Sequence, residues 1–263
     1  MGSETPIVLP SILKKTSALI PDDRNFPALH EPCQGEAWTS FELLGLLTRS
    51  LSLIQKENNQ PLLVAIGGPG GTGKSTFSQS LHLELGTASS LLTLDDYKTP
   101  RAERAEQGIF GAHPEANKMD LIAEHMEALA KGETIQRPIY DAVSGSIVGS
   151  EPVPSRPIII IDGEISTYES FRELLHVSIF IDAHWRTQLQ TRLNRDIDVR
   201  QYSPEKAIET FLQSNLREFK TYGAHSIDWS DVLLWCDSEY QLSLKSIHPK
   251  WTPFFERVLY EDD

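Results

Sequence analysis

The stretch "GGPGGTGKST", residues 67–76, restricts the fold of this chain more than any other feature of its sequence. It contains five glycines and no bulky apolar side chain, so it cannot supply the core of a helix or a strand. It directly follows the apolar run "PLLVAI", and such a run is typical of a strand that is buried on both faces. The stretch is therefore expected to be a loop that connects a buried strand to the next element.

The spacing of these residues matches the phosphate-binding P-loop, G-x-x-x-x-G-K-[ST]. Glycines let the backbone bring N–H groups close to phosphate oxygens, and the following helix points its positive end at the anion. Lys74 can reach the β- and γ-phosphates, and the Ser75 hydroxyl can ligate Mg²⁺. The alternative is a glycine-rich turn without a ligand, but the flanking strand and helix patterns favour ATP. The predicted nucleotide-binding residues of the loop are Gly68, Pro69, Gly70, Gly71, Thr72, Gly73, Lys74, Ser75 and Thr76.

Short apolar runs alternate with helical patterns along the chain. This alternation predicts an α/β fold of three layers, in which helices cover both faces of a mostly parallel five-stranded sheet. One helical pattern spans residues 74–85, a second starts at Asn117 and stops at Gly132, and a third begins with Pro204. The predicted strands are residues 62–66, 90–94, 157–162, 177–182 and 231–236.

The organisation of the chain follows from the same patterns. We predict an N-terminal arm and helix over residues 1–60, a P-loop domain over residues 61–245 and a tail over residues 246–263. Segment 98–155 is long and strand-poor, so it is expected to be an insertion over the sheet edge. Residues 185–203 are expected to form a lid.

The helix of the N-terminal region has a clear start signal. Thr39 and Glu42 form a capping-box pattern, in which each side chain accepts a hydrogen bond from the other residue's backbone N–H. The apolar residues that follow are predicted to lie on one helical face. They are Phe41, Leu44, Leu47, Leu51 and Ile54.

Composition excludes several classes of protein. The net charge of −13 disfavours a broad nucleic-acid interface, although a cleft can still concentrate positive charge locally. Cys33 and Cys236 are far apart, which argues against a disulfide framework or a zinc knuckle. No apolar run approaches the ~20 residues that cross a bilayer, and the N-terminus lacks a secretory signal pattern. We expect a cytoplasmic protein without a membrane or nucleic-acid partner.

Carboxylates follow two of the predicted strands. In "IIIIDGE", Asp162 ends an apolar strand in the Walker B arrangement, with Glu164 as the second candidate for orienting Mg²⁺. In "LDDYK", Asp95 and Asp96 should open onto the same sheet edge, where a carboxylate can accept a proton from an attacking hydroxyl. The alternatives are a helix cap for Asp162 and a solvated loop for the Asp95 pair. With a P-loop upstream, we favour the metal role for Asp162.

Arginines cluster in "RLNRDIDVR", residues 192–200. Arg192 and Arg195 share a helix face, and Arg200 follows in a loop. Arginines that close over a transferring phosphate stabilise its charge and exclude water. The alternative is a surface helix in which Asp196 and Asp198 pair with these arginines.

The order of these motifs, with "HPEANKMD" and "RPIYD" between them, resembles the phosphoribulokinase/uridine kinase family of P-loop kinases. The resemblance covers about residues 62–235; the P-loop is generic, whereas "PEAN", "PIYD" and the "RDIxxR" run are more particular to the family. It implies that segment 98–155 binds the acceptor and that Asp95 is the catalytic base. Further implied roles are Asp162, with Ser75 and Asp95, near Mg²⁺; Arg192 facing the acceptor; Arg195 and Arg200 facing the nucleotide phosphates; and Tyr140 at the position where uridine kinases contact the base.

Departures from the family pattern concern the acceptor. Ala142 and Gly145 replace an aromatic residue and a histidine of uridine kinases, and Ala112 replaces the aspartate that holds the ribose hydroxyls. Lys98 replaces the histidine that follows the catalytic aspartate in many phosphoribulokinases, and "DGEIS" replaces their "EGLH". These departures predict an acceptor particular to this chain, such as a sugar, a sugar phosphate or another small polyol.

The resemblance thus implies a kinase that transfers the γ-phosphoryl group of ATP to a hydroxyl, with Asp95, Lys74 and Arg192 as catalytic residues. Lys98 and Arg101 could bind an anionic acceptor or only solvate their loop, and His113 could touch the acceptor or cap the helix at 117. Alternatives are a uridine or nucleoside kinase proper, a regulatory P-loop ATPase without an acceptor, and a non-enzymatic scaffold. The expected partners are ATP and a small hydroxyl-bearing metabolite, and a homo-oligomer is left open.

Overall fold

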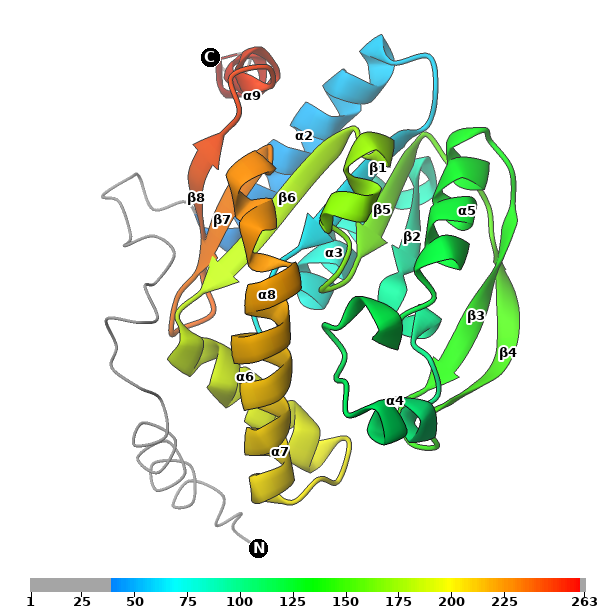
Figure 1. Ribbon diagram of the computed structural model, residues 1–263. Helices are drawn as coiled ribbons and strands as arrows, with labels where there is room; N and C mark the ends of the chain where they lie inside the picture. Colours follow the sequence, from blue (N-terminus) through cyan, green and yellow to red (C-terminus); the bar gives the residue numbers. More distant parts are fainter. Residues whose placement is uncertain (1–38, 261–263) are drawn as a thin grey trace, which may run out of the picture.

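A six-stranded sheet forms the centre of the computed structural model, which describes residues 39–260 (Figure 1). Its order is β2-β5-β1-β6-β7-β8, in which the first five strands run parallel and β8 pairs antiparallel with β7. The five parallel strands confirm the predicted sheet, and the sixth was not predicted. The strands are β1 (Leu62–Gly67), β2 (Ser89–Thr93), β5 (Ile158–Asp162), β6 (Val177–Ala183), β7 (Val232–Cys236) and β8 (Leu242–Ile247).

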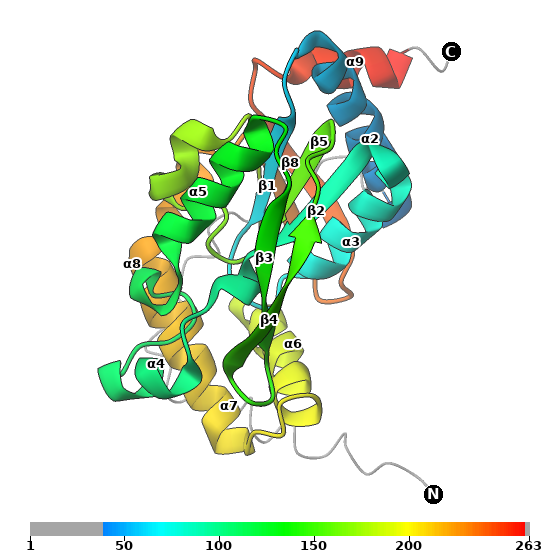
Figure 2. The same cartoon turned by 90° about the vertical axis from the view of Figure 1, so that its right-hand side faces the viewer.

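Helices cover both faces of this sheet, which gives the predicted three layers (Figure 2). On one face, α2 (Ser40–Glu57), α3 (Lys74–Leu85) and α9 (Thr252–Tyr260) pack on side chains such as Val64 and Ile66. On the other face, α5 (Met119–Ala130) and α8 (Lys220–Tyr222) cover the alternate residues of the same strands, such as Leu63. Both faces of the central strands are therefore buried, which is why their sequences are continuously apolar.

The capping box of α2 is present as predicted. The Glu42 backbone N–H donates to the Thr39 hydroxyl, and the Thr39 backbone N–H donates to the Glu42 carboxylate. The predicted apolar face is partly wrong, because Phe41 is 78% exposed while Leu43 and Leu46 are fully buried. Leucines on adjacent faces of this helix permit more than one apolar stripe, and packing on the sheet and α3 selects the stripe through Leu43.

Segment 98–155 is not strand-poor. It contains α4 (Arg101–Gln107), α5 and an antiparallel hairpin of β3 (Ile135–Asp141) and β4 (Ser146–Val153). Pro138 and Pro152 hide these strands in the sequence, because proline lacks the N–H that a ladder needs. Both prolines are tolerated here because each strand of the hairpin has only one partner.

Residues 185–203, which were predicted to form a lid, and the long helix after them complete the fold. Residues Trp185–Asp198 form α6, and α7 (Pro204–Phe211) continues through the π-helical segment Leu212–Phe219 into α8. Helix α7 begins at Pro204 as predicted, with Ser203 as its N-cap, whereas the π-helical segment was not predicted. Short 3₁₀ segments connect the other elements: η2 (Gly86–Ala88), η3 (Leu94–Tyr97), η4 (Pro114–Ala116), η5 (Glu169–Leu174) and η7 (Ala224–Trp229).

The two end segments of the predicted organisation are only partly covered by the described residues. Residues 1–38 of the predicted arm, with Cys33, lie outside the described residues. The predicted tail contains α9, whose Phe255 and Val258 pack into the same core as α2. Among residues 39–260, the structure has no helix that is both long and apolar enough to span a membrane.

Candidate active site

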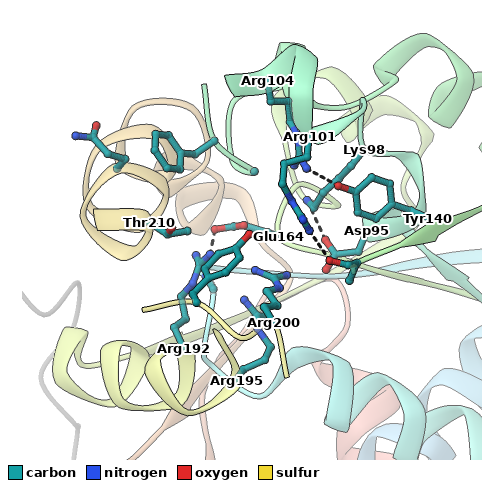
Figure 3. A pocket seen from close by; sticks show the side chains of 18 of the residues that line it. Asp95, Lys98, Arg101, Arg104, Tyr140, Glu164, Arg192, Arg195, Arg200 and Thr210 are labelled. Atoms are coloured by element: carbon teal, nitrogen blue, oxygen red, sulfur yellow. Dashed lines mark hydrogen bonds and ion pairs between the residues drawn. The ribbon is translucent and has the colours of Figure 1, made fainter. Parts of the chain in front are cut away.

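A cavity of about 800 Å³ opens at the carboxyl edge of the parallel sheet (Figure 3). The P-loop forms its floor, α4 and β3 line one side, and α6 and α7 line the other. Ligands of open α/β sheets bind at this edge, because the loops after the strands converge there. The cavity therefore lies at the sheet edge where the sequence patterns predict that the nucleotide and the acceptor bind.

The P-loop needs glycine where its backbone passes close to neighbouring elements. Gly68 has a φ of 126°, and a side chain there would overlap the carbonyl oxygen of Ile181 in β6. Gly71 has a φ of 87°, and a side chain there would overlap the carbonyl oxygen of Gln188 in α6. Gly73 precedes α3 without a side-chain cap, so the amides of the first helical turn keep their N–H groups for an anion.

Lys74 lies at the floor of the cavity and is 7% exposed. Its Nζ donates to the carbonyl oxygen of Pro69 at 2.6 Å. Burial lowers the pKa of Lys74, while the carboxylates of Glu164, Asp162 and Asp95 act in the opposite direction. A phosphate anion at the P-loop would add counter-charge to this buried ammonium group.

Asp162 and Glu164, the two candidates for orienting Mg²⁺, lie in different positions relative to the cavity. Asp162 ends β5, is 3% exposed and accepts a hydrogen bond from Ser78 at 3.0 Å. Burial raises the pKa of Asp162, and the charge of Lys74 and a hydrogen bond from Ser75 oppose that shift. Glu164 instead lines the cavity and accepts from the backbone N–H of Gly70 at 3.3 Å.

These oxygens suit Mg²⁺ in the presence of a nucleotide. Within residues 39–260 there is no cluster of three or more His, Cys, Asp or Glu side chains that could hold a metal by themselves. Mg²⁺ typically takes one or two carboxylates, waters and the phosphates of its nucleotide, so such a cluster is not needed. Ser75 lines the cavity, and a hydrogen bond from Ser75 favours the charged form of Asp162 and lowers its pKa against the effect of burial.

Asp95 faces the P-loop across the cavity from η3, directly after β2. Its Oδ1 lies 3.0 Å from Nζ of Lys98, and its side chain is half-exposed to the cavity. The charge of Lys98, with those of Arg195 and Arg200, holds the pKa of Asp95 well below its ordinary value. Asp96 has a different task, since it binds the backbone N–H of Tyr140 and the guanidinium of Arg137 and so fixes the hairpin.

The three arginines of "RLNRDIDVR" surround one buried carboxylate. Asp196 has no exposed surface, and its Oδ1 lies 3.3 Å from Nε of Arg195 and 3.0 Å from Nη1 of Arg200. Nε of Arg192 lies 4.0 Å from its Oδ2. The two interpretations of this motif, ion pairing within the helix and contact with a phosphate, are thus compatible. The arginines pair with Asp196 and also line the cavity.

Arg192 is the most buried of the three and contacts the π-helical segment. Its Nη1 donates to Oδ1 of Asn215, whose Nδ2 donates to the carbonyl oxygen of Gly70 at 2.7 Å. Asn215 also donates to Oε1 of Gln188 at 3.0 Å. One amide side chain therefore connects the P-loop, α6 and the long helix, and π-helical turns often occur at such sites.

The side chains on the predicted acceptor side of the cavity contact one another and the β3–β4 hairpin. Arg104 donates to the Tyr140 hydroxyl at 2.6 Å and lies 5.6 Å from the centre of its ring. Arg101 donates to the carbonyl oxygens of Ala142 and Val143 in the hairpin turn. Arg101, Tyr140 and Lys98 line the cavity, so the structure brings these three predicted residues together, and Arg104, which was not predicted, lines it beside them.

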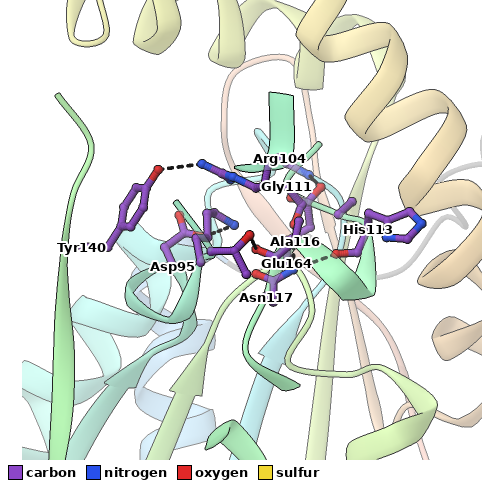
Figure 4. A network of polar contacts seen from close by, with 12 residues as sticks. Asp95, Arg104, Gly111, His113, Ala116, Asn117, Tyr140 and Glu164 are labelled. Carbon is purple, nitrogen blue, oxygen red and sulfur yellow. Dashed lines mark hydrogen bonds and ion pairs between the residues drawn. The ribbon is translucent and has the colours of Figure 1, made fainter. Parts of the chain in front are cut away.

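His113 does not join them. Its Nδ1 accepts from the backbone N–H of Glu115 and caps η4, and its Nε2 lies 3.1 Å from the Tyr222 hydroxyl. It does not line the cavity, and Figure 4 shows its ring pointing away from Asp95. The sequence left open whether His113 touches the acceptor or caps the helix at 117. In the structure His113 is a cap, and it caps η4 rather than α5.

The cavity is strongly basic although the chain is acidic. Four carboxylates line it, from Asp95, Asp96, Glu164 and Glu209, and nine Lys and Arg side chains outnumber them. Burial and the neighbouring Arg195 lower the pKa of Arg192, as expected where cations crowd together. The nine cations are Lys74, Lys98, Arg101, Arg104, Arg192, Arg195, Arg200, Lys206 and Arg217.

Sequence reasoning missed Arg104, Lys206, Arg217 and Asn215, because no short motif contains them. One signal was available for Asn215. It lies four residues from both Phe211 and Phe219, so it falls on the apolar face of its helix, where an amide needs buried partners. The basic side chains of α4 and α7 carry no comparable signal, since charged residues on a helix are ordinarily solvated.

A family model described as Phosphoribulokinase / Uridine kinase family matches residues 63–236. The chloroplastic phosphoribulokinase of Triticum aestivum is 28% identical over 195 residues, which cover 66% of this chain and 48% of that protein. The uridine kinase of Leuconostoc citreum is 32% identical over 163 residues, which cover 58% of this chain and 77% of that protein. The chain spans about half the length of the phosphoribulokinases that it matches.

Solved structures agree on the fold. A protein described as a putative fructose transport system kinase from Silicibacter sp. superposes with a TM-score of 0.59 at 19% identity, covering 71% of this chain and 94% of the other. The phosphoribulokinase from Rhodobacter spheroides superposes with a TM-score of 0.56 at 14% identity, covering 68% of this chain and 71% of the other.

Proposed function

Since this chain belongs to the phosphoribulokinase/uridine kinase family, we propose that it is an ATP-dependent kinase that transfers the γ-phosphoryl group to a hydroxyl of a small anionic metabolite. One observation carries the proposal: the P-loop and Asp95 face the same cavity, whose other walls hold a surplus of cations. Phosphoryl transfer depends mainly on positioning and on neutralising charge, and this arrangement supplies both.

The phosphate side of the reaction uses the floor of the cavity. The amides of the P-loop and the ammonium group of Lys74 bind the phosphates; this ammonium group has three N–H donors, one of which it donates to the carbonyl oxygen of Pro69. Ser75 and Asp162 are the residues that would hold Mg²⁺, directly or through water. When bound, the ion neutralises charge on the phosphates.

The acceptor side uses Asp95. Its carboxylate orients the acceptor hydroxyl and takes the proton as the oxygen attacks the γ-phosphorus. Because nearby cations hold its pKa low, Asp95 is ionised in the free protein and acts chiefly by aligning the hydroxyl. Lys98, 3.0 Å from Asp95, lies where it would also attract a negatively charged acceptor.

An anionic acceptor explains the excess charge. Arg192, Arg195, Arg200 and Lys74 lie around the P-loop and suit the triphosphate, while Arg104, Lys206 and Arg217 come from α4 and the long helix on the acceptor side. A phosphate or carboxylate group on the acceptor would bind these remaining cations. We therefore favour a sugar phosphate or a sugar acid over a neutral sugar.

The alternatives fit the same cavity less well. For a nucleoside acceptor, Tyr140 would need its hydroxyl, which already binds Arg104, and Ala112 is fully buried and has no polar group for the ribose. A regulatory ATPase without an acceptor would have no use for Asp95 opposite the P-loop. Neither alternative accounts for the cations of α4 and α7.

A screen for ADP release tests the proposal. Wild type and Asp95→Asn are assayed with Mg-ATP and a library of sugar phosphates, sugar acids, neutral sugars and nucleosides. We expect at least one anionic compound to stimulate wild type and to leave Asp95→Asn slower by a factor of about 100 or more. Stimulation by nucleosides alone, or by no compound, would refute the assignment.

A further inference from the structure

A second cavity of about 290 Å³ lies behind the P-loop, between the end of β6, the start of α6 and the segments around α8 and η7. Among residues 39–260, it shares no lining residue with the candidate active site. Its volume is close to the lower end of the range for metabolite pockets. The proposed reaction makes no use of this cavity.

The floor of this cavity is polar and incompletely paired. Asp182 is 3% exposed, and its carboxylate accepts a hydrogen bond from the backbone N–H of Ala183 at 2.8 Å. Among residues 39–260 this carboxylate forms no ion pair, although the exposed Lys220 also lines the cavity. Trp185, 6% exposed, has a buried Nε1 donor that finds no partner among the same residues. Such groups are costly unless something else completes their hydrogen bonds.

The walls of the cavity are mostly apolar, and the exposed residues Lys220, His225 and Asp228 also line it. Phe219 is buried, and Leu216, Ala224 and Ile227 are partly buried around the opening. A molecule that fits has an apolar body for these walls, an N–H donor for the Asp182 carboxylate and an oxygen for the Trp185 donor. A cationic donor fits best, since it supplies the missing counter-charge to a buried carboxylate.

The cavity also contacts the residues that hold the P-loop. Pro69 lines it, and the carbonyl oxygen of Pro69 binds Lys74 on the opposite side of the loop. Asn215 lines it too, and donates to the carbonyl oxygen of Gly70. A molecule in this cavity would therefore press on the loop from behind, while the phosphates occupy its front.

We propose that this second cavity is an effector site for a small amphipathic amine, whose ammonium group pairs with Asp182 and whose apolar body packs on Phe219 and Leu216. Occupation would stabilise the present position of the P-loop and so change the affinity for Mg-ATP. The binding site stands independently of the reaction, whereas its effect on the nucleotide rests on the proposed function. The ammonium group would also favour the ionised form of Asp182, whose pKa is raised to about 7 because burial outweighs the hydrogen bond from Ala183 and the charge of Lys74.

Calorimetry and ligand-observed NMR on the full chain test the site, with 2-amino-1-phenylethanol as the amine probe and 1-phenylethanol as the neutral control. We expect wild type to bind the amine at least tenfold more tightly than the neutral control. Asp182→Asn should lose that preference. Ala224→Leu, which fills the cavity from its wall, should weaken the binding of both probes at least tenfold. If Asp182→Asn does not fold, this second variant alone tests the site.

The remaining outcomes overturn the proposal. Equal binding of the amine to wild type and to both variants would place the probe elsewhere on the protein. Simple competition between the amine and Mg-ATP would assign the cavity to the nucleotide site, and no binding of either probe would leave no amine site. None of these readouts requires catalysis, so their failure is distinguishable from failure of the proposed kinase activity.

Discussion

The ammonium nitrogen of Lys98 lies 3.0 Å from a carboxylate oxygen of Asp95, inside the cavity that the P-loop lines. Lys98 is largely buried, whereas Asp95 is half-exposed to the cavity. The charge of Lys98 is the main reason that the pKa of Asp95 is well below its ordinary value. This pair therefore connects the residue that aligns the acceptor with a cation that can attract it.

Replacing Lys98 should move the acid limb of the pH–rate profile. In Lys98→Met the pKa of Asp95 rises, so protonation removes the carboxylate at a higher pH than in wild type. We expect the acid limb of kcat/KM to shift upward by about one pH unit, the size of a nearby charge effect. Lys131→Met, which removes an exposed partner of Glu127 on a different surface, serves as the control. Identical acid limbs in wild type and Lys98→Met would show that Lys98 does not set this pKa.

The P-loop should reject even one methyl group at Gly68. Gly68→Ala places a side chain at a φ of 126° and against the carbonyl oxygen of Ile181. We expect the free energy of unfolding in urea to fall by about 2 kcal/mol or more. Gly45→Ala is the matched control, because nothing lies within 4 Å of the added methyl group in the middle of α2. That variant should gain about 0.5–1 kcal/mol, and equal losses in both variants would contradict the geometry.

Asp196 should hold the lid arginines together. Asp196→Asn leaves Arg195 and Arg200 without the buried carboxylate that both contact. We expect the free energy of unfolding to fall by on the order of 3 kcal/mol, since breaking a buried ion pair leaves charge uncompensated. Asp198→Asn, two residues along the same helix and exposed, should change it by less than about 0.5 kcal/mol. Equal stability of the two variants would mean that the arginines do not depend on Asp196.

Asp182 should make stability fall as the pH rises. Its pKa is about 7 in the folded protein, because burial outweighs its hydrogen bond from Ala183, and lies near 3.8 in the unfolded chain. Between these values the unfolded chain releases a proton that the folded protein keeps, so ionisation favours unfolding. The slope approaches about 1.4 kcal/mol per pH unit for one group. Urea titrations from pH 4 to 8 should show this decline in wild type relative to Asp182→Asn, and parallel curves would contradict it.

Local sequence patterns predicted the elements whose signals do not depend on tertiary contacts. The strand and P-loop around Gly68, the capping box of Thr39 and the start of α7 at Pro204 all follow from residues within a few positions of each other. The opening of Asp95 onto the P-loop cavity also followed, because the carboxyl ends of parallel strands meet at one edge.

Features that packing decides could not be predicted in this way. The buried face of α2 depended on what covers it, so Phe41 was misplaced. The hairpin was not predicted because Pro138 interrupts the apolar–polar alternation of β3. Lys206 lines the cavity only because α6 and the long helix fold over the sheet edge. His113 was left open between two roles, and its contact with Tyr222, more than a hundred residues away, selected one.

Isotope transfer tests the central claim most directly, namely that ATP and an acceptor hydroxyl meet in one cavity between the P-loop and Asp95. The acceptor found in the ADP-release screen is incubated with wild type and ATP carrying ¹⁸O on its γ-phosphoryl group, and the products are analysed by mass spectrometry. We predict that the labelled phosphoryl group appears on the acceptor in step with ADP, and that Asp95→Asn slows this transfer by a factor of about 100 or more. Label found only in inorganic phosphate, at the same rate in wild type and Asp95→Asn, would contradict the account.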